Sequence, residues 1–183
     1  MDKVEMFGYI AHNLAPRAEH RLMWLKNVRF PVLNNLVDQA CLSLNYMDEM
    51  HLLNKSKFHP TKDYMDEMAK LADIAMSGYL YLLGGASTPS KVANQMVDTY
   101  KRKNADYGDS FSASLDKYGP VAAHVRMSDK INRLQSLVVR KQTAQVKDES
   151  IADTFLDLAC YAIMRLVYIV IKSEEIEEEK ENK

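Results

Sequence analysis

The sequence predicts an all-α fold, in the form of a helical bundle. The chain has 183 residues but only 6 glycines and 5 prolines, too few for the many turns of a sheet protein of this length. Apolar residues recur at helical spacing, and no segment of useful length shows the polar–apolar alternation of a strand. We therefore expect long helices whose core is drawn from the 47% of residues that are hydrophobic.

The N-terminal part is predicted to contain three helices. The expected spans are residues 4–26, 33–53 and 64–83. Pro16 predicts a kink or break in the first helix, because proline cannot donate the backbone hydrogen bond that a helix interior needs. Residues 54–63 are expected to form a loop, and Gly84 with Gly85 should end the third helix.

A polar linker at residues 86–91 predicts the boundary between two parts of the chain. We expect an N-terminal helical part at 1–90, a C-terminal helical module at 91–172 and an acidic tail at 173–183 that frays.

Four helices are predicted in the C-terminal module. Their expected spans are residues 92–105, 109–117, 120–140 and 151–171. Asp109 or Ser110 is the expected N-cap of the second, and Asp148 of the last. The segment KNADYGDSF, residues 103–111, is predicted to be mainly a loop.

The charge and cysteine content narrow the class of protein. A formal net charge of −1 argues against a dedicated duplex DNA binder, although Lys101, Arg102 and Lys103 form a local basic cluster. Cys41 and Cys160 lie in apolar helical contexts and are expected to be buried free thiols in a reducing compartment. No N-terminal signal is visible, so we expect a cytoplasmic protein.

Residues 151–171 are long and apolar enough to resemble a membrane span. Asp153, Asp157 and Arg165 lie within this segment, and each mid-membrane charge would cost roughly 2.5–3.5 kcal/mol. We therefore expect no membrane insertion but a buried helix of a bundle. Because this helix is apolar on nearly all sides, we also expect a homo-oligomer, a dimer or larger.

Charged residues form one face of the helix predicted at 120–140. Arg126, Asp129, Lys130 and Arg133 share this face through i, i+3, i+4, i+7 spacing, and it lies beside the apolar face. One interpretation is the wall of a cleft. The other is a solvated face whose internal ion pairs contribute only about 0.3–0.5 kcal/mol each.

Three carboxylates form a ridge at the start of the last helix. Glu149, Asp153 and Asp157 recur every four residues, and the two aspartates are expected to be embedded among apolar neighbours. Like charges at this spacing repel, so something must compensate them. A magnesium ion could do so, as could pairing with Arg126, Lys130 or Arg133 in a structural network.

The polar side chains of KNADYGDSF suggest contact with a ligand. Lys103 could meet phosphate, Asn104 a base or sugar, and Tyr107 could stack on a base. Gly108 would permit a close approach of the backbone. The alternative is a capped helix–loop–helix junction without a ligand.

The segments KNADYGDSF, RMSDKINRL and DESIADTFLDLACYAI, in this order, resemble the nucleotide-modification-associated domain of phage and bacterial proteins. More distantly they resemble the all-α MazG-like nucleoside triphosphate pyrophosphohydrolases. The MazG-like pattern has Glu-x-x-Glu and Glu-x-x-Asp on two helices, which hold Mg²⁺ against a nucleoside triphosphate. Asp153 matches the last acid, Glu149 lies four rather than three residues before it, and Asp129 stands on the first helix without its acidic partner.

The resemblance implies a Mg²⁺-dependent hydrolase that releases pyrophosphate from an ordinary or modified deoxynucleoside triphosphate, in a bacterial or phage-infected cell. The implied catalytic residues are Asp129, Lys130, Glu149 and Asp153. The implied metal ligands are Asp129, Glu149, Asp153 and Asp157. The implied substrate-binding residues are Lys103, Asn104, Tyr107, Arg126, Lys130 and Arg133. The alternative is a non-catalytic module that binds a nucleotide, nucleic acid or a protein, accessory to phage DNA modification.

Overall fold

The computed structural model describes residues 1–27, 30–53, 60–143 and 149–181. Every regular element in these ranges is a helix, and no strand occurs in them, so the all-α prediction is confirmed. The elements are α1 (Lys3–Leu25), α2 (Val32–Leu53), α3 (Lys62–Leu83), the 3₁₀ turn η1 (Gly84–Ala86), α4 (Pro89–Tyr107), α5 (Ser110–Tyr118), α6 (Val121–Leu134), the π-helical turn η2 (Gln135–Val139) and α7 (Ile151–Glu181).

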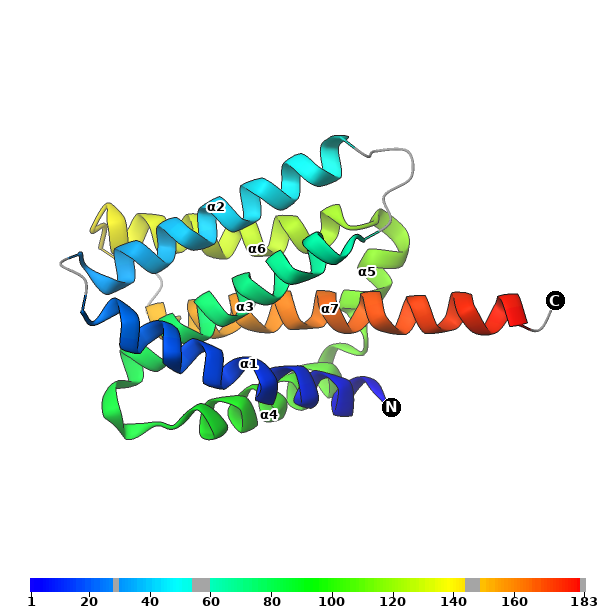
Figure 1. Cartoon of the computed structure of the whole chain (residues 1–183), viewed down its shortest axis with the longest axis horizontal. Coiled ribbons are helices and arrows are strands. Elements are labelled where there is room, and N and C mark those ends of the chain that lie inside the picture. The colour runs from blue at the N-terminus through cyan, green and yellow to red at the C-terminus, as the bar shows by residue number, and fades with distance from the viewer. Residues whose placement is uncertain (28–29, 54–59, 144–148, 182–183) are drawn as a thin grey trace.

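The helices form a bundle around the contact between α3 and α7 (Figure 1). The pair α1 and α4 packs on one side of this centre, and α2 and α6 lie together on the other. Helices from both sides of the predicted boundary at residue 90 therefore contribute to one hydrophobic core.

Gly78 allows the two central helices to approach each other closely. A Cβ atom at this position of α3 would lie 2.4 Å from Cε1 of Phe155 on α7, much closer than two carbon atoms pack. The Phe155 ring is fully buried, so it fills the space that a side chain at Gly78 would need.

The segment predicted to be a loop at residues 103–111 is mostly helical. Helix α4 continues to Tyr107, and only Gly108 and Asp109 separate it from α5. Gly108 ends α4 with a φ of 60°, a left-handed conformation that glycine adopts without steric cost. Asp109 then caps α5 by accepting a hydrogen bond from the Ser112 backbone N–H at 3.3 Å, as predicted.

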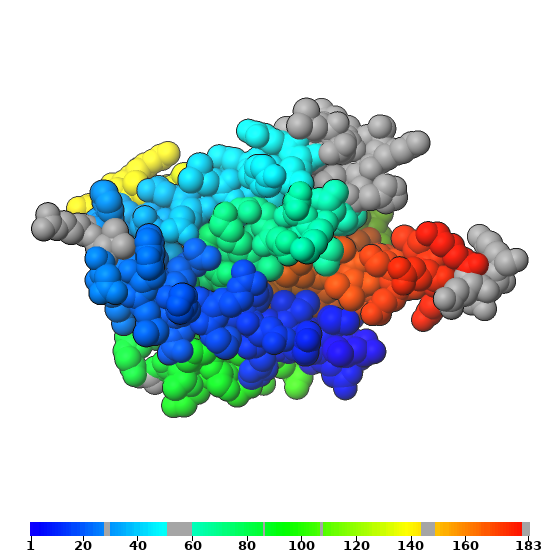
Figure 2. Space-filling model, in the orientation of Figure 1, coloured from blue at the N-terminus to red at the C-terminus, as the bar shows by residue number. Residues whose placement is uncertain are grey.

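Helix α1 continues through Pro16 without a break, and the alternative of a kink at this proline stays a prediction. The expected end of the last helix is wrong. Helix α7 does not end near residue 171 but continues to Glu181, with Lys172 and Glu175 forming an ion pair at 2.8 Å in its extension. Figure 2 shows this extension projecting beyond the other helices. The predicted cap Asp148 lies outside the described residues.

Helix α7 is long and apolar enough to cross a membrane by its length and composition. In the bundle, 67% of its most apolar stretch is buried by the protein itself. This burial gives the apolar faces of α7 partners within the chain.

Candidate functional site

An ion-pair network joins α4, α6 and the start of α7. Lys130 of α6 lies at its centre, with its Nζ atom 2.8 Å from Glu149 Oε1 and 3.0 Å from Asp157 Oδ2. Lys103 of α4 pairs with the other oxygen of Asp157 at 2.7 Å. Arg133 donates to the Glu149 backbone oxygen at 2.6 Å, so it fixes the chain just before α7. Five of the predicted site residues thus belong to one network, in which Lys103, Lys130 and Arg133 contact Asp157 or Glu149.

The protonation states of this network follow from its geometry. Burial acts to raise the pKa of Asp157, but the hydrogen bonds and charges of Lys103 and Lys130 outweigh it and hold the pKa below its usual range. Burial acts to lower the pKa values of both lysines, and the carboxylates outweigh it and raise them. All three groups are therefore ionised at neutral pH.

Asp153 serves a different purpose from the one its spacing suggested. It is exposed rather than embedded, and it forms a capping box with Ser150. The Asp153 backbone N–H donates to Ser150 Oγ at 3.0 Å, while the Ser150 backbone N–H donates to Asp153 Oδ2 at 3.0 Å. Ser150 thus takes the capping position predicted for Asp148. Asp129 is also exposed, on the outer side of α6.

The residues do not fit the predicted magnesium site as they are arranged here. Glu149 and Asp157 both accept from Lys130, and the Asp153 carboxylate is engaged at the end of its own helix. Within the described ranges, no three His, Cys, Asp or Glu side chains are grouped so that they could hold a metal ion. Of the two explanations for the ridge, the arrangement favours the structural network.

A pocket of about 410 Å³ opens beside this network. It is lined by residues of α1, α4, α5, α6 and α7, and by Gly108 and Asp109 between α4 and α5. The predicted site residues that line it are Lys103, Asn104, Arg126 and Asp157. Lys130, Arg133 and Glu149 do not line the pocket, although Lys130 pairs with Asp157, which does. Asp129 and Asp153 are not part of the lining either. The position of the Tyr107 side chain is not described.

Aromatic rings line much of the pocket. Phe111 of α5 stacks with Tyr161 of α7, their centroids 5.9 Å apart, and Tyr100 of α4 stacks on Phe7 with a centroid distance of 4.5 Å. Tyr168 adds a fourth ring to the lining. Burial, followed by its hydrogen bond to Asp116, raises the pKa of Tyr168 to about 12, so its hydroxyl stays protonated.

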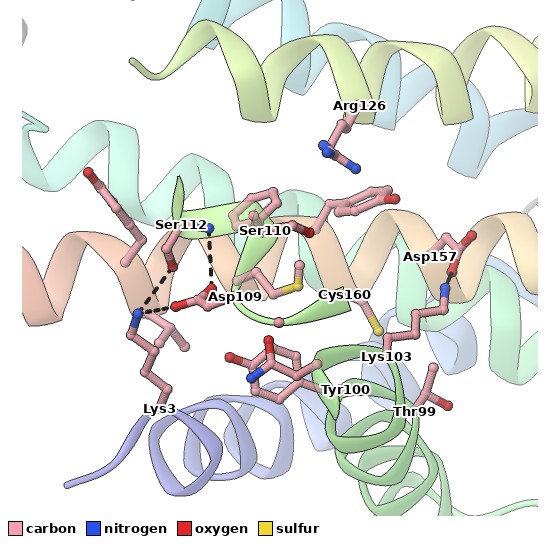
Figure 3. Close-up of a pocket in the computed structure, with 17 residues that line it drawn as sticks. Lys3, Thr99, Tyr100, Lys103, Asp109, Ser110, Ser112, Arg126, Asp157 and Cys160 are labelled. Carbon is pink, nitrogen blue, oxygen red and sulfur yellow. Dashed lines mark hydrogen bonds and ion pairs between the residues drawn. The ribbon is translucent and has the colours of Figure 1, made fainter. Parts of the chain in front are cut away.

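Arg126 is the cation best placed to meet a ligand. Its guanidinium lies over the Tyr161 ring, 5.8 Å from the centroid. No carboxylate of the described part of the chain forms an ion pair with it, unlike Lys3 and Lys103. Figure 3 shows these three cations approaching the pocket from three sides. A planar donor beside aromatic rings suits a ligand that carries both an anionic group and a flat ring.

Cys160 also lines the pocket but is not suited to nucleophilic chemistry. Burial is the main reason that its pKa is raised to about 12, so the thiol stays protonated. Both cysteines are free, as predicted; Cys160 is buried and Cys41 is half-buried.

The sequence motifs pointed to the pocket but missed several of its residues. Five lining positions on α7 follow helical spacing and could have been read as one face: Asp157, Cys160, Tyr161, Met164 and Tyr168. Lys3 carried no such signal, because it lies 106 residues from its partner Asp109.

The fold and this pocket define the class of the protein: an all-α bundle with an aromatic, cation-rich pocket among its C-terminal helices. Residues 103–169 match the family model described as nucleotide modification associated domain 1. The first resemblance inferred from the three motifs is therefore confirmed over this segment. The distant MazG-like similarity stays a prediction. No curated protein and no solved structure matches the chain.

Proposed function

We propose that the pocket binds a nucleotide, with its base against the aromatic side chains and its phosphate at Arg126 and Lys103. The observation that carries this proposal is the Arg126 guanidinium beside the stacked Tyr161 and Phe111 rings. Base–aromatic stacking contributes about 1–3 kcal/mol per base, and arginine binds phosphate with two parallel hydrogen bonds.

Two further features support a nucleotide rather than another aromatic anion. The family model that matches residues 103–169 is described as a nucleotide modification associated domain. These residues supply most of the pocket lining. Asn104 offers both a donor and an acceptor to the edge of a base or to a sugar hydroxyl.

The test is calorimetric titration with each deoxynucleoside 5′-monophosphate and triphosphate. We expect Arg126→Gln to weaken binding roughly 10–100-fold, because a hydrogen bond to a charged group contributes about 1.5–3 kcal/mol. Arg140→Gln is the matched control, since Arg140 is exposed and lies outside the pocket. Equal affinities for the wild type and Arg126→Gln would contradict the proposal.

The predicted pyrophosphohydrolase is a second candidate for the same pocket. The support for a hydrolase is that the Glu149 and Asp157 carboxylates both lie within 3.0 Å of one point, which the Lys130 ammonium occupies. Magnesium could use these carboxylates only if it replaced the Lys130 ammonium. Pyrophosphate release from each triphosphate, with Mg²⁺ and with a chelator, separates a hydrolase from a binding module.

The remaining partner assignments stay predictions. An affinity for single-stranded DNA that fell steeply with salt would support the nucleic-acid alternative at the Lys101–Lys103 cluster. Light scattering would test the predicted homo-oligomer.

A further inference from the structure

Lys3 extends the pocket beyond the segment that matches the family model. It lies in the first turn of α1 and lines the pocket from the N-terminal part of the chain. Its ammonium forms an ion pair with Asp109 and donates to Ser112 Oγ at 3.3 Å. Figure 3 shows Lys3 and Lys103 on opposite sides of the pocket, with Tyr100 between them.

The two lysines are held in the same way. Each pairs with a carboxylate that has a second donor of its own. Asp157 also accepts from Lys130 at 3.0 Å, and Asp109 also accepts from the Ser112 backbone N–H at 3.3 Å. Either lysine can therefore move to a ligand without leaving its carboxylate unsatisfied.

The charges of the pocket lining favour an anionic ligand. Three cations line the pocket, Lys3, Lys103 and Arg126, against two carboxylates, Asp109 and Asp157. Lys130, which does not line the pocket, further neutralises Asp157 through its ion pair with Oδ2. The side chain of Lys3 is 38% exposed and that of Lys103 is 56% exposed, so both ammonium groups can be reached from solvent.

We propose that the pocket binds a nucleotide with anionic groups at both ends, one at Arg126 and Lys103 and the other at Lys3. This inference rests on the proposed function, because both use the same pocket, and it adds the class of ligand. A nucleoside bisphosphate has this chemistry: a flat base and two separated phosphates. The N-terminal part of the chain then supplies a specificity-determining residue.

The experiment compares deoxynucleoside 5′-monophosphates with the corresponding 3′,5′-bisphosphates by calorimetric titration. We expect the bisphosphate of at least one base to bind about tenfold tighter or more, because a second charge-assisted contact forms at Lys3. Lys3→Met should abolish this gain while leaving monophosphate affinity within about twofold. Lys62→Met is the control, since the Lys62 side chain is 90% exposed at the start of α3.

Asp109→Asn tests whether Lys3 contacts the ligand or only holds the start of α5 in place through its ion pair with Asp109. Asparagine is as good an N-cap as aspartate, so α5 should keep its start, while Lys3 loses its carboxylate partner. We expect this variant to bind the bisphosphate several-fold tighter, opposite in sign to Lys3→Met. If the Lys3–Asp109 ion pair were only structural, Lys3→Met and Asp109→Asn would instead both weaken the binding of both ligands to a similar extent.

Three outcomes would overturn the inference. In the first, the wild type binds the monophosphate and the bisphosphate with equal affinity. In the second, the tighter binding of the bisphosphate survives Lys3→Met. In the third, Lys3→Met and Asp109→Asn both weaken the binding of both ligands. If neither ligand binds, the proposed function itself fails as well. Lys3→Arg, which keeps the charge, should retain the gain; circular dichroism of each variant verifies that it is folded.

Discussion

At the scale of single residues, Asp157 connects three helices. It lies on α7 and accepts from Lys103 of α4 and Lys130 of α6, and its side chain is only 18% exposed. Removing one member of a buried pair costs about 3–5 kcal/mol, but Lys103 is partly in solvent, so the loss should be smaller. We expect Asp157→Asn to lower the free energy of unfolding by about 1–3 kcal/mol at pH 7, as measured by urea denaturation.

The stability difference between the wild type and Asp157→Asn should depend on pH, and the lowered pKa of Asp157 fixes the direction of this dependence. The pKa of Asp157 is lowered in the folded protein, so its stabilising contribution is complete above the unfolded pKa of about 4 and is lost as the pH falls through the folded pKa. The difference between wild type and Asp157→Asn should therefore be constant from pH 7 to about 5 and shrink below about 4.

Asp153→Asn is the matched control for Asp157→Asn. Its exposed carboxylate closes only the capping box with Ser150, so the substitution should cost less than about 1 kcal/mol. If Asp153→Asn proved the more damaging, with loss of magnesium-dependent nucleotide binding, the original metal-site prediction would regain its support.

Sequence reasoning found the parts of the site that share a helix face. Arg126 and Lys130 follow helical spacing on α6, and Asp157 lies on the ridge at the start of α7. The sequence did not show that Asp153 is exposed while Asp157 is largely covered, because the burial of Asp157 depends on packing against α4 and α6. Sequence reasoning could have read Ser150 and Asp153 as a capping box, since that pairing is local. Lys3 could not be found in this way, because its partner is distant in sequence.

At the scale of helices, Gly78 controls the central contact between α3 and α7. Alanine usually stabilises a helix interior by about 1 kcal/mol relative to glycine. Here its methyl group would overlap the buried Phe155 ring, and overpacking typically costs about 1–3 kcal/mol. We expect Gly78→Ala to lower the melting temperature of the protein despite its higher helix propensity.

Gly8→Ala provides the control, because Gly8 is also inside a helix. Its nearest non-local neighbour, Val97 Cγ2, would lie 3.4 Å from the new Cβ atom, which is ordinary contact. This variant should be neutral or stabilised by up to about 1 kcal/mol. An increase in melting temperature for Gly78→Ala would show that α3 and α7 pack less closely than the structure indicates.

Helix positions were more predictable than helix ends. Long apolar periodicity placed α3 and α7 correctly, because that signal accumulates over several turns. Helix α4 ends later than the sequence predicts, because the polar residues at 103–106 favour a loop by composition although all of them are compatible with helix. The true stop is Gly108, whose positive φ marks the end of the helix.

At the scale of the whole molecule, one core is shared by the two predicted parts. The apolar faces of α7 are covered by α1, α3 and α6, so the bundle already supplies the partners that an oligomer was expected to provide. A dimer therefore stays a prediction, but its original motivation is met within the chain. The matched segment 103–169 likewise depends on helices that precede it.

We expect a fragment of residues 91–183 to lack a fixed tertiary structure. Without α3, the buried faces of Phe155, Leu158 and Ala162 would be open to water, and each square ångström of apolar surface left exposed costs about 25 cal/mol. The fragment should keep a helical far-ultraviolet circular dichroism spectrum but lose its tyrosine signal in the near ultraviolet and bind a hydrophobic dye.

The full chain is the control, with both spectra complete and little dye bound. A single cooperative urea transition in the isolated fragment would instead show that the C-terminal module folds independently. Lys3 would then be what the first ninety residues contribute to the pocket lining, rather than the support that lets the C-terminal helices fold.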